Sequence, residues 1–68
     1  METTNKTYYI CYSIFEKYED IVKVSSTLDT YIKFKQWEQA HFYISTLNIT
    51  DKEAERLAYC VDSYKRSC

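Results

Sequence analysis

The fold class of this 68-residue chain depends on residues 7–15, which read TYYICYSIF. Aromatic and β-branched side chains are dense in this stretch, and such residues favour strands. A second strand is expected at about 20–25, where the residues IVKVS (21–25) alternate in character. The charged residues between the two segments then form the loop of a hairpin. The sequence therefore predicts an N-terminal β-hairpin with strands at about 7–15 and 20–25.

The same stretch also fits a helix. Apolar side chains recur through it at steps of three and four residues, namely at Cys11, Ile14, Phe15, Tyr18, Ile21 and Val22. The chain also has no glycine and no proline, the two residues that most weaken a helix. Strand propensity decides the choice, so we expect an α+β fold in which the hairpin packs on two helices. An all-α three-helix bundle is the alternative.

The last third of the chain predicts a helix over 50–66. Thr50 and Glu53 have the spacing of a capping box, in which each side chain binds the other residue's backbone N–H group. Apolar residues then recur at helical spacing, at Ala54, Leu57, Ala58, Val61, Tyr64 and Cys68. Acidic residues stand at the start of this segment and basic residues at its end, which suits the helix dipole.

The middle of the chain predicts a second helix over 27–47. Ser26 and Asp29 have the spacing of another capping box, and Asn48 suits a left-handed stop at the helix end. Apolar side chains occur on two sides of this helix. One side can pack in the core, and the other must be covered by a different part of the protein or by a partner. The alternative is a break near Ala40 followed by a strand over 41–47. Together the four segments are expected to form one small domain over 1–68.

Composition excludes several classes of function. Without glycine the chain cannot form a glycine-rich phosphate loop or a dinucleotide-binding fingerprint. The net charge of −1 leaves no positive excess to neutralise phosphates, so nucleic acid is not expected as a partner. The alternative is a small nucleic-acid-associated regulator that uses a local patch of Lys33, Lys35, Lys65 and Arg66.

The residues that carry most chemistry are few and scattered. His41 is the only histidine, and a nucleophilic pair with Cys11 or Cys60 needs an electropositive setting that neither cysteine has in the sequence. Cys11, His41, Cys60 and Cys68 match the number of ligands of a zinc site, but they lack the close pairs typical of one. We therefore expect neither an enzyme, nor a metal site, nor a cofactor.

The aromatic residues point to binding. The chain has twelve of them, eight of which are tyrosine, and a core this small takes up about half. The others lie at the surface, where Tyr and Trp dominate protein-binding hot spots. The expected protein-binding face lies around the middle helix and consists of Phe34, Trp37 and His41, with Tyr31 and Ile44 beside them. Glu16, Glu19 and Asp20 are expected to meet a basic surface of the partner. For the aromatic residues, the alternative is that the tyrosines pack around the core of the protein itself. For the three acidic residues, the alternative is a loop exposed to solvent.

The function expected from these patterns is that of a small intracellular protein-binding module. It would act as a stoichiometric inhibitor or adaptor that occupies a surface of a larger protein, and burial of the second apolar helix side makes a homodimer reasonable. No apolar run approaches the ~18 residues of a membrane span, so a cytoplasmic protein without a membrane partner is expected. The size and the Lys, Ile and Tyr content are compatible with a phage gene and an anti-host or anti-defence role.

Overall fold

The computed structural model describes residues 5–67, with side chains from residue 6 onward, and this part of the chain is helical with short connections. The helices are α1 (Asn5–Ile14), α2 (Tyr18–Lys33), α3 (Trp37–Thr46) and α4 (Asp51–Ser67). None of these helices has both the length and the apolar character needed to cross a membrane.

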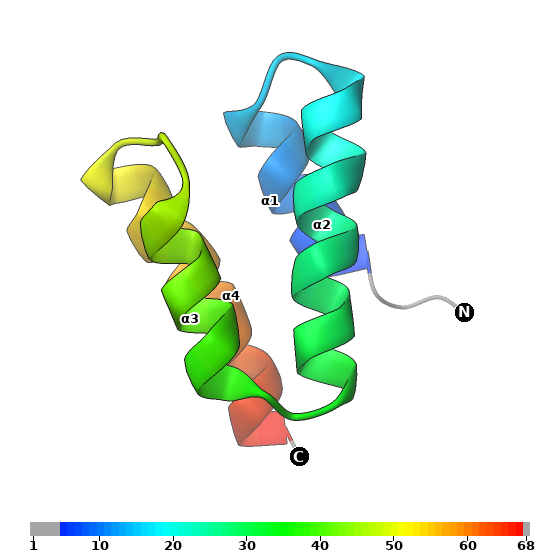
Figure 1. Cartoon of the computed structure of the whole chain (residues 1–68), viewed down its shortest axis with the longest axis vertical. Helices are drawn as coiled ribbons and strands as arrows, with labels where there is room; N and C mark the ends of the chain where they lie inside the picture. Colours follow the sequence, from blue (N-terminus) through cyan, green and yellow to red (C-terminus); the bar gives the residue numbers. More distant parts are fainter. Residues whose placement is uncertain (1–4, 68) are drawn as a thin grey trace.

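The helices pack as two antiparallel pairs. In Figure 1, α2 and α3 lie in front, while α1 lies behind α2 and α4 lies behind α3. Each helix packs against the next one in the chain, and α4 also packs against α1 and α2. The molecule measures 30 × 26 × 15 Å, so it is flat and its core is thin.

The core is built from small and medium side chains supplied by all four helices. Its apolar members, each less than 5% exposed, are Cys11, Ile21, Val24, Leu28, Ala40, Ile44, Leu57, Cys60 and Val61. Thr7 and Ser25 are buried with them. No aromatic ring belongs to this buried set, so the helices approach closely and the rings pack around the edges of the core.

The expected β-hairpin is wrong. Residues 7–14 lie within α1 and residues 20–25 within α2, and no strand occurs in residues 5–67. The helical period places Thr7 and Cys11, four residues apart, side by side against the core, where both are completely buried. This burial outweighs the strand propensity of TYYICYSIF, because propensity is weaker than tertiary packing. The all-α alternative gives the correct class, with four helices in place of three.

The expected helix over 27–47 is also wrong in its bounds. The segment around Ser26 continues α2, so Ser26 and Asp29 form no capping box, and the Ser26 carbonyl instead accepts a hydrogen bond from the Thr30 hydroxyl at 2.9 Å. Thr27 donates in the same way to the Lys23 carbonyl, also at 2.9 Å. These bonds occupy hydroxyl groups that otherwise compete with the helix. Residues 41–46 are helical, so the alternative strand over 41–47 is absent as well.

A Schellman motif divides the middle segment into α2 and α3. The Gln36 N–H group donates to the Tyr31 carbonyl at 2.8 Å, and the Lys35 N–H group donates to the Ile32 carbonyl at 3.0 Å. The motif needs one residue in the left-handed region, and Lys35 occupies it with φ 58°. Among the described residues Lys35 alone has a positive φ, so the left-handed stop lies there and not at Asn48.

The C-terminal helix agrees with its pattern. The helix expected over 50–66 extends from Asp51 to Ser67. The predicted capping box is confirmed, because Thr50 N donates to Glu53 Oε1 at 3.0 Å and Glu53 N donates to Thr50 Oγ1 at 3.2 Å. Leu57 and Val61 face the core with at most 1% exposure, as the periodicity predicts. Cys68, the last residue of the predicted stripe, lies outside the described residues.

Replacing Lys35 by glycine is expected to stabilise the protein by about 0.5–1 kcal/mol, because glycine adopts a positive φ without a Cβ clash. Lys33→Gly, two residues earlier and inside α2, is the matched control and should destabilise by up to about 1 kcal/mol. Urea unfolding followed by circular dichroism measures both changes. A Lys35→Gly variant as unstable as Lys33→Gly would contradict the role of this residue in ending α2.

Candidate functional site

The aromatic side chains are the largest apolar groups at the surface. None of the twelve is fully buried, and six are exposed while six are partly buried. The exposed six are Tyr9, Tyr12, Tyr18, Phe34, Phe42 and Tyr59, with exposed fractions between 62% and 71%. Exposed rings that lie together mark interaction surfaces, whereas isolated ones need no explanation. The question is therefore which of these rings are neighbours.

Four tyrosines form one continuous surface, which we call the tyrosine face: Tyr8, Tyr9, Tyr12 and Tyr18. The ring centroid of Tyr8 lies 6.2 Å from that of Tyr9 and 6.2 Å from that of Tyr12. Tyr12 and Tyr18 line the same surface depression, which joins α2 to the set. Partial desolvation raises the pKa of Tyr8, and the neighbouring Tyr18 hydroxyl group raises it further. Tyr8 is half-buried and the other three are exposed, so the face presents three accessible rings around a fixed one.

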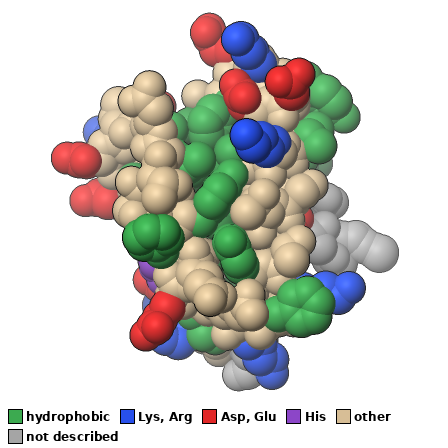
Figure 2. Space-filling view, viewed as in Figure 1, with side chains coloured by type: hydrophobic (Ala, Val, Ile, Leu, Met, Phe, Trp, Pro, Cys, Tyr) green, Lys and Arg blue, Asp and Glu red, His purple; other side chains and the backbone are tan. Residues whose placement is uncertain are grey.

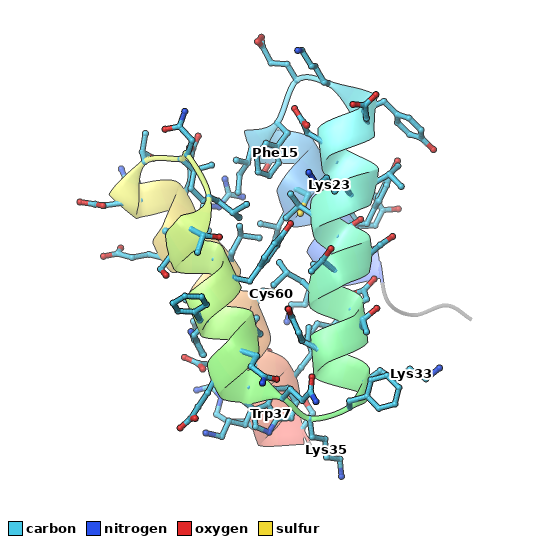
Figure 3. All side chains as sticks on the ribbon, in the orientation of Figure 1. Phe15, Lys23, Lys33, Lys35, Trp37 and Cys60 are labelled. Atoms are coloured by element: carbon cyan, nitrogen blue, oxygen red, sulfur yellow. The ribbon has the colours of Figure 1, made fainter. Side chains whose placement is uncertain are left out.

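A surface depression adjoins the tyrosine face where α1 ends and α2 begins. It has a volume of about 420 Å³, and we call it the α1–α2 hollow. It is lined by Tyr12, Phe15, Glu16, Tyr18 and Ile21. The three-residue connection between the helices brings these side chains together. In Figure 3, Phe15 lies at the end of α1 beside the start of α2. The hollow therefore has aromatic walls and one carboxylate.

The three acidic residues expected to bind a partner occur at this end of the molecule. Glu16 is in the connection and lines the α1–α2 hollow. Glu19 and Asp20 are in the first turn of α2, where negative charge stabilises the helix dipole. Figure 2 shows acidic and basic side chains gathered over this end of the molecule. Lys17 and Lys23 are exposed residues of the same stretch of sequence, and their charges offset part of the negative charge. Glu16 is the acid most directly associated with the aromatic surface.

Tyr31, Phe34 and Trp37 lie at the opposite end, around the turn between α2 and α3. Phe34 is 63% exposed, and the Lys33 ammonium group lies 6.0 Å from its ring centroid. Tyr31 is half-buried, and its ring centroid is 6.2 Å from that of Tyr43. Trp37 is half-buried as well and packs against the core. These three residues are therefore separated from the acidic residues by the length of α2.

The other two residues of the expected face have structural contacts. His41 Nε2 lies 2.9 Å from Asp62 Oδ1, which links α3 to α4. Ile44 is only 4% exposed and belongs to the core, so its expected place on a binding surface is wrong. The helical break at residues 34–36 causes this, because α3 turns Ile44 toward α2 and α4. The expected face is therefore divided among the turn between α2 and α3, the contact of α3 with α4, and the core.

Of the four basic residues expected as one patch, two line one depression and the other two lie against aromatic rings. Lys35 and Lys65 line a depression of about 480 Å³ together with Trp37 and Glu38. The Arg66 guanidinium group lies 5.6 Å from the ring centroid of Tyr59, two turns earlier on α4. In Figure 3, Lys33 extends to the right of the view and Lys35 extends downward. Lys33, Lys65 and Arg66 also occupy last turns of helices, where positive charge stabilises the dipole.

A groove between α2 and α3 is a further surface feature. It has a volume of about 320 Å³, and its lining consists of Phe15, Asp20, Lys23, Val24, Tyr43, Leu47 and Asn48. Figure 2 shows the hydrophobic side chains of this face as a stripe along the seam of the two helices. Most of these apolar side chains are partly buried against the core, so the groove exposes little of each.

The buried thiols have no catalytic setting. Burial raises the pKa of the Cys11 thiol to about 12, with smaller contributions from Cys60 and Asp29. Burial also raises the pKa of Cys60, whose sulfur lies 3.6 Å from the Thr7 hydroxyl oxygen. Both groups are therefore neutral thiols at neutral pH. Within residues 6–67 no three His, Cys, Asp or Glu side chains converge as metal ligands would.

Asp29 is the carboxyl group most affected by this buried region. It is half-buried on α2, and burial raises its pKa above the ordinary value of 3.8. The neighbouring Thr7 hydroxyl group offsets part of the rise. The folded state thus binds the Asp29 proton more tightly than the unfolded state. Asp29 stabilises the fold below pH 3.8, and this contribution is lost as the pH rises through the higher folded-state value.

Both buried cysteines are expected to resist modification in the folded protein. With Cys68 replaced by serine, so that only Cys11 and Cys60 report, labelling by iodoacetamide should be at least roughly tenfold slower than in urea. The physical reason is the combination of zero or near-zero exposure and a raised pKa. The measurement is mass spectrometry of timed samples. Rapid labelling without urea would indicate an activated thiol.

Replacing Asp29 by asparagine is expected to raise the melting temperature at pH 7, because it removes a charge from a partly desolvated site. The gain over the unchanged protein should shrink as the pH falls through the raised pKa of Asp29, because Asp29 itself then becomes protonated in the folded state. Thermal unfolding at several pH values measures the difference. A gain that is constant or grows at low pH would contradict the raised pKa.

The tyrosine face is a site that the sequence did not indicate. A strand over 7–15 would have placed Tyr9 on the side opposite to Tyr8 and Tyr12, whereas the helix brings the three together. Comparison of the chain with protein-family models, with curated proteins and with solved structures finds no significant match.

Proposed function

We propose that the protein is a binding module that acts by occupying a surface of a larger protein, and that the tyrosine face makes the contact. The observation that supports this most strongly is the clustering of Tyr8, Tyr9, Tyr12 and Tyr18 at the junction of two helices. Three of these rings are exposed by 62–67%. They cover neighbouring positions, as the central residues of a protein interface do.

The chemistry of tyrosine supports binding to protein. A tyrosine ring supplies a large contact area, and its hydroxyl group still forms hydrogen bonds after the ring is covered. It also loses little conformational entropy, because only two side-chain torsions are fixed. Tyr8 already contacts its two neighbours on α1, so part of the ordering cost is met in the free protein.

Stoichiometric inhibition or an adaptor role fits this architecture better than turnover. The connections have three, three and four residues, which leaves no long loop to enclose a substrate. Four depressions of the surface are open to solvent and not enclosed, and the two buried thiols are held neutral. A small rigid body with an aromatic face acts by covering a partner's surface. A cellular enzyme or defence complex is the kind of target that such coverage would block.

The tyrosine face is tested by removing two of its rings. Tyr9→Ser with Tyr12→Ser should weaken binding to the natural partner by at least about tenfold, since hot-spot tyrosines each contribute about 1–2 kcal/mol or more. Serine has nearly the helix propensity of tyrosine, so α1 should persist. Capture from an extract of the source cells, with quantitative mass spectrometry, identifies the partner, and calorimetry with that partner measures the affinity.

Phe42→Ser is the matched control. Phe42 is 71% exposed on α3, which shares no packing contact with α1, so its removal should change the affinity by less than about twofold. A partner that tolerates the tyrosine double variant but not Phe42→Ser would overturn the proposed site.

Light scattering of the free protein shows whether the partner is a second copy of the chain.

The alternative of a nucleic-acid-associated regulator has less support. It needs Lys33, Lys35, Lys65 and Arg66 to act together, and the contacts with Phe34 and Tyr59 direct two of them elsewhere. Only Lys35 and Lys65 share a depression, which Glu38 also lines. Affinity for phosphate groups depends on the number of cations that act together.

A further inference from the structure

We propose that the α1–α2 hollow receives an arginine side chain of the partner. This inference depends on the proposed function and adds the chemistry of the group that is recognised. The hollow lies directly beside the tyrosine face, because Tyr12 and Tyr18 belong to both. A partner that covers the face therefore also covers the hollow.

The walls of the hollow suit a flat cation. Tyr12 and Tyr18 are exposed by 62% and 67%, and Phe15 supplies a third ring that packs against the core. The faces of aromatic rings carry partial negative charge and attract cations within about 6 Å. The planar guanidinium group of arginine stacks on such rings, which the compact and strongly hydrated ammonium group of lysine does less well.

Glu16 supplies the charge that the rings lack. Its carboxylate is exposed in the hollow, and no cation of residues 6–67 lies within ion-pair distance of it. Glu19 and Asp20 follow within the next turn, so three carboxylates outnumber the single lysine, Lys17, within residues 16–20. Two oxygens of one carboxylate can accept two parallel N–H bonds from arginine, a geometry that lysine does not offer.

Three other surface depressions lack this combination. Lys35 and Lys65 line the depression beside Trp37, and Lys52 and Arg56 line the one between α1 and α4. Lys23 and Asp20 both line the groove between α2 and α3. Of these four depressions, only the α1–α2 hollow is lined by an acid without a base, together with three aromatic rings. This difference favours a cationic occupant at this position.

The test uses acetyl-arginine-methylamide as the probe and its citrulline analogue as the neutral control of the same shape. In a nuclear magnetic resonance titration of the isotopically labelled protein, the arginine probe should shift the signals of residues 12–21. The citrulline compound should shift them much less. Equal shifts with both compounds, shifts spread over the whole surface, or no shifts would each overturn the inference.

Glu16→Gln should reduce the response to the arginine probe by about threefold to fivefold, as the loss of one exposed ion pair predicts. Glu55→Gln, an exposed carboxylate on α4, is the matched control and should leave it unchanged. Tyr9→Ser should also leave the arginine response unchanged, because Tyr9 lies outside the hollow, while it weakens partner binding.

These variants separate the two proposals. Partner binding that is lost with Tyr9→Ser but unaffected by Glu16→Gln would overturn the arginine site and leave the binding function in place. Partner binding that is unaffected by Tyr9→Ser and by Tyr12→Ser would overturn the tyrosine face, whatever the probe does. Weaker partner binding with Glu16→Gln, together with a smaller response to the probe, supports both proposals.

Discussion

The four helices approach one another through small side chains, and this close packing determines where the larger residues lie. Thr7 and Cys11 on α1, Ala40 on α3 and Cys60 on α4 are buried to 1% exposure or less. A large ring at any of these positions would push the helices apart, because packed cores have little room for added volume. The twelve aromatic rings therefore surround the core instead of filling it, and several become available to a partner.

Sequence reasoning identified the parts of the fold that carry local signals. The capping box at Thr50 and the stripe through Leu57 and Val61 indicate α4 without ambiguity, because cap and periodicity agree. Residues 7–15 carry opposing signals. Their residue types favour a strand, whereas the four-residue spacing of Thr7 and Cys11 favours a helix, and this spacing stabilises the helix only when both residues pack against the core. The break after α2 contains no glycine or proline that would predict it from the sequence. Lys35 adopts the left-handed conformation at this position.

The candidate site depends on whether residues 7–15 form a helix and on where the following helix ends. Only part of the site was therefore predictable from the sequence. Glu16 was recognised as an acid near a turn, which remains its position in the structure. The tyrosine face was missed because Tyr8, Tyr9 and Tyr12 share a side only in a helix, and because Tyr18 joins them only when α2 folds back along α1. Ile44 was misplaced for the related reason that an unbroken helix would have turned it outward.

Binding and folding are linked in a chain of this size. A small core supplies little net stability, and the half-buried Asp29 reduces it further at neutral pH. The tyrosine face exists only while α1 is packed through Thr7 and Cys11, so a partner that holds this face binds the folded state alone. Such a partner stabilises the fold in proportion to the logarithm of its free concentration. A partner that covers the aromatic rings excluded from the core would therefore complete a burial that the chain does not achieve by itself.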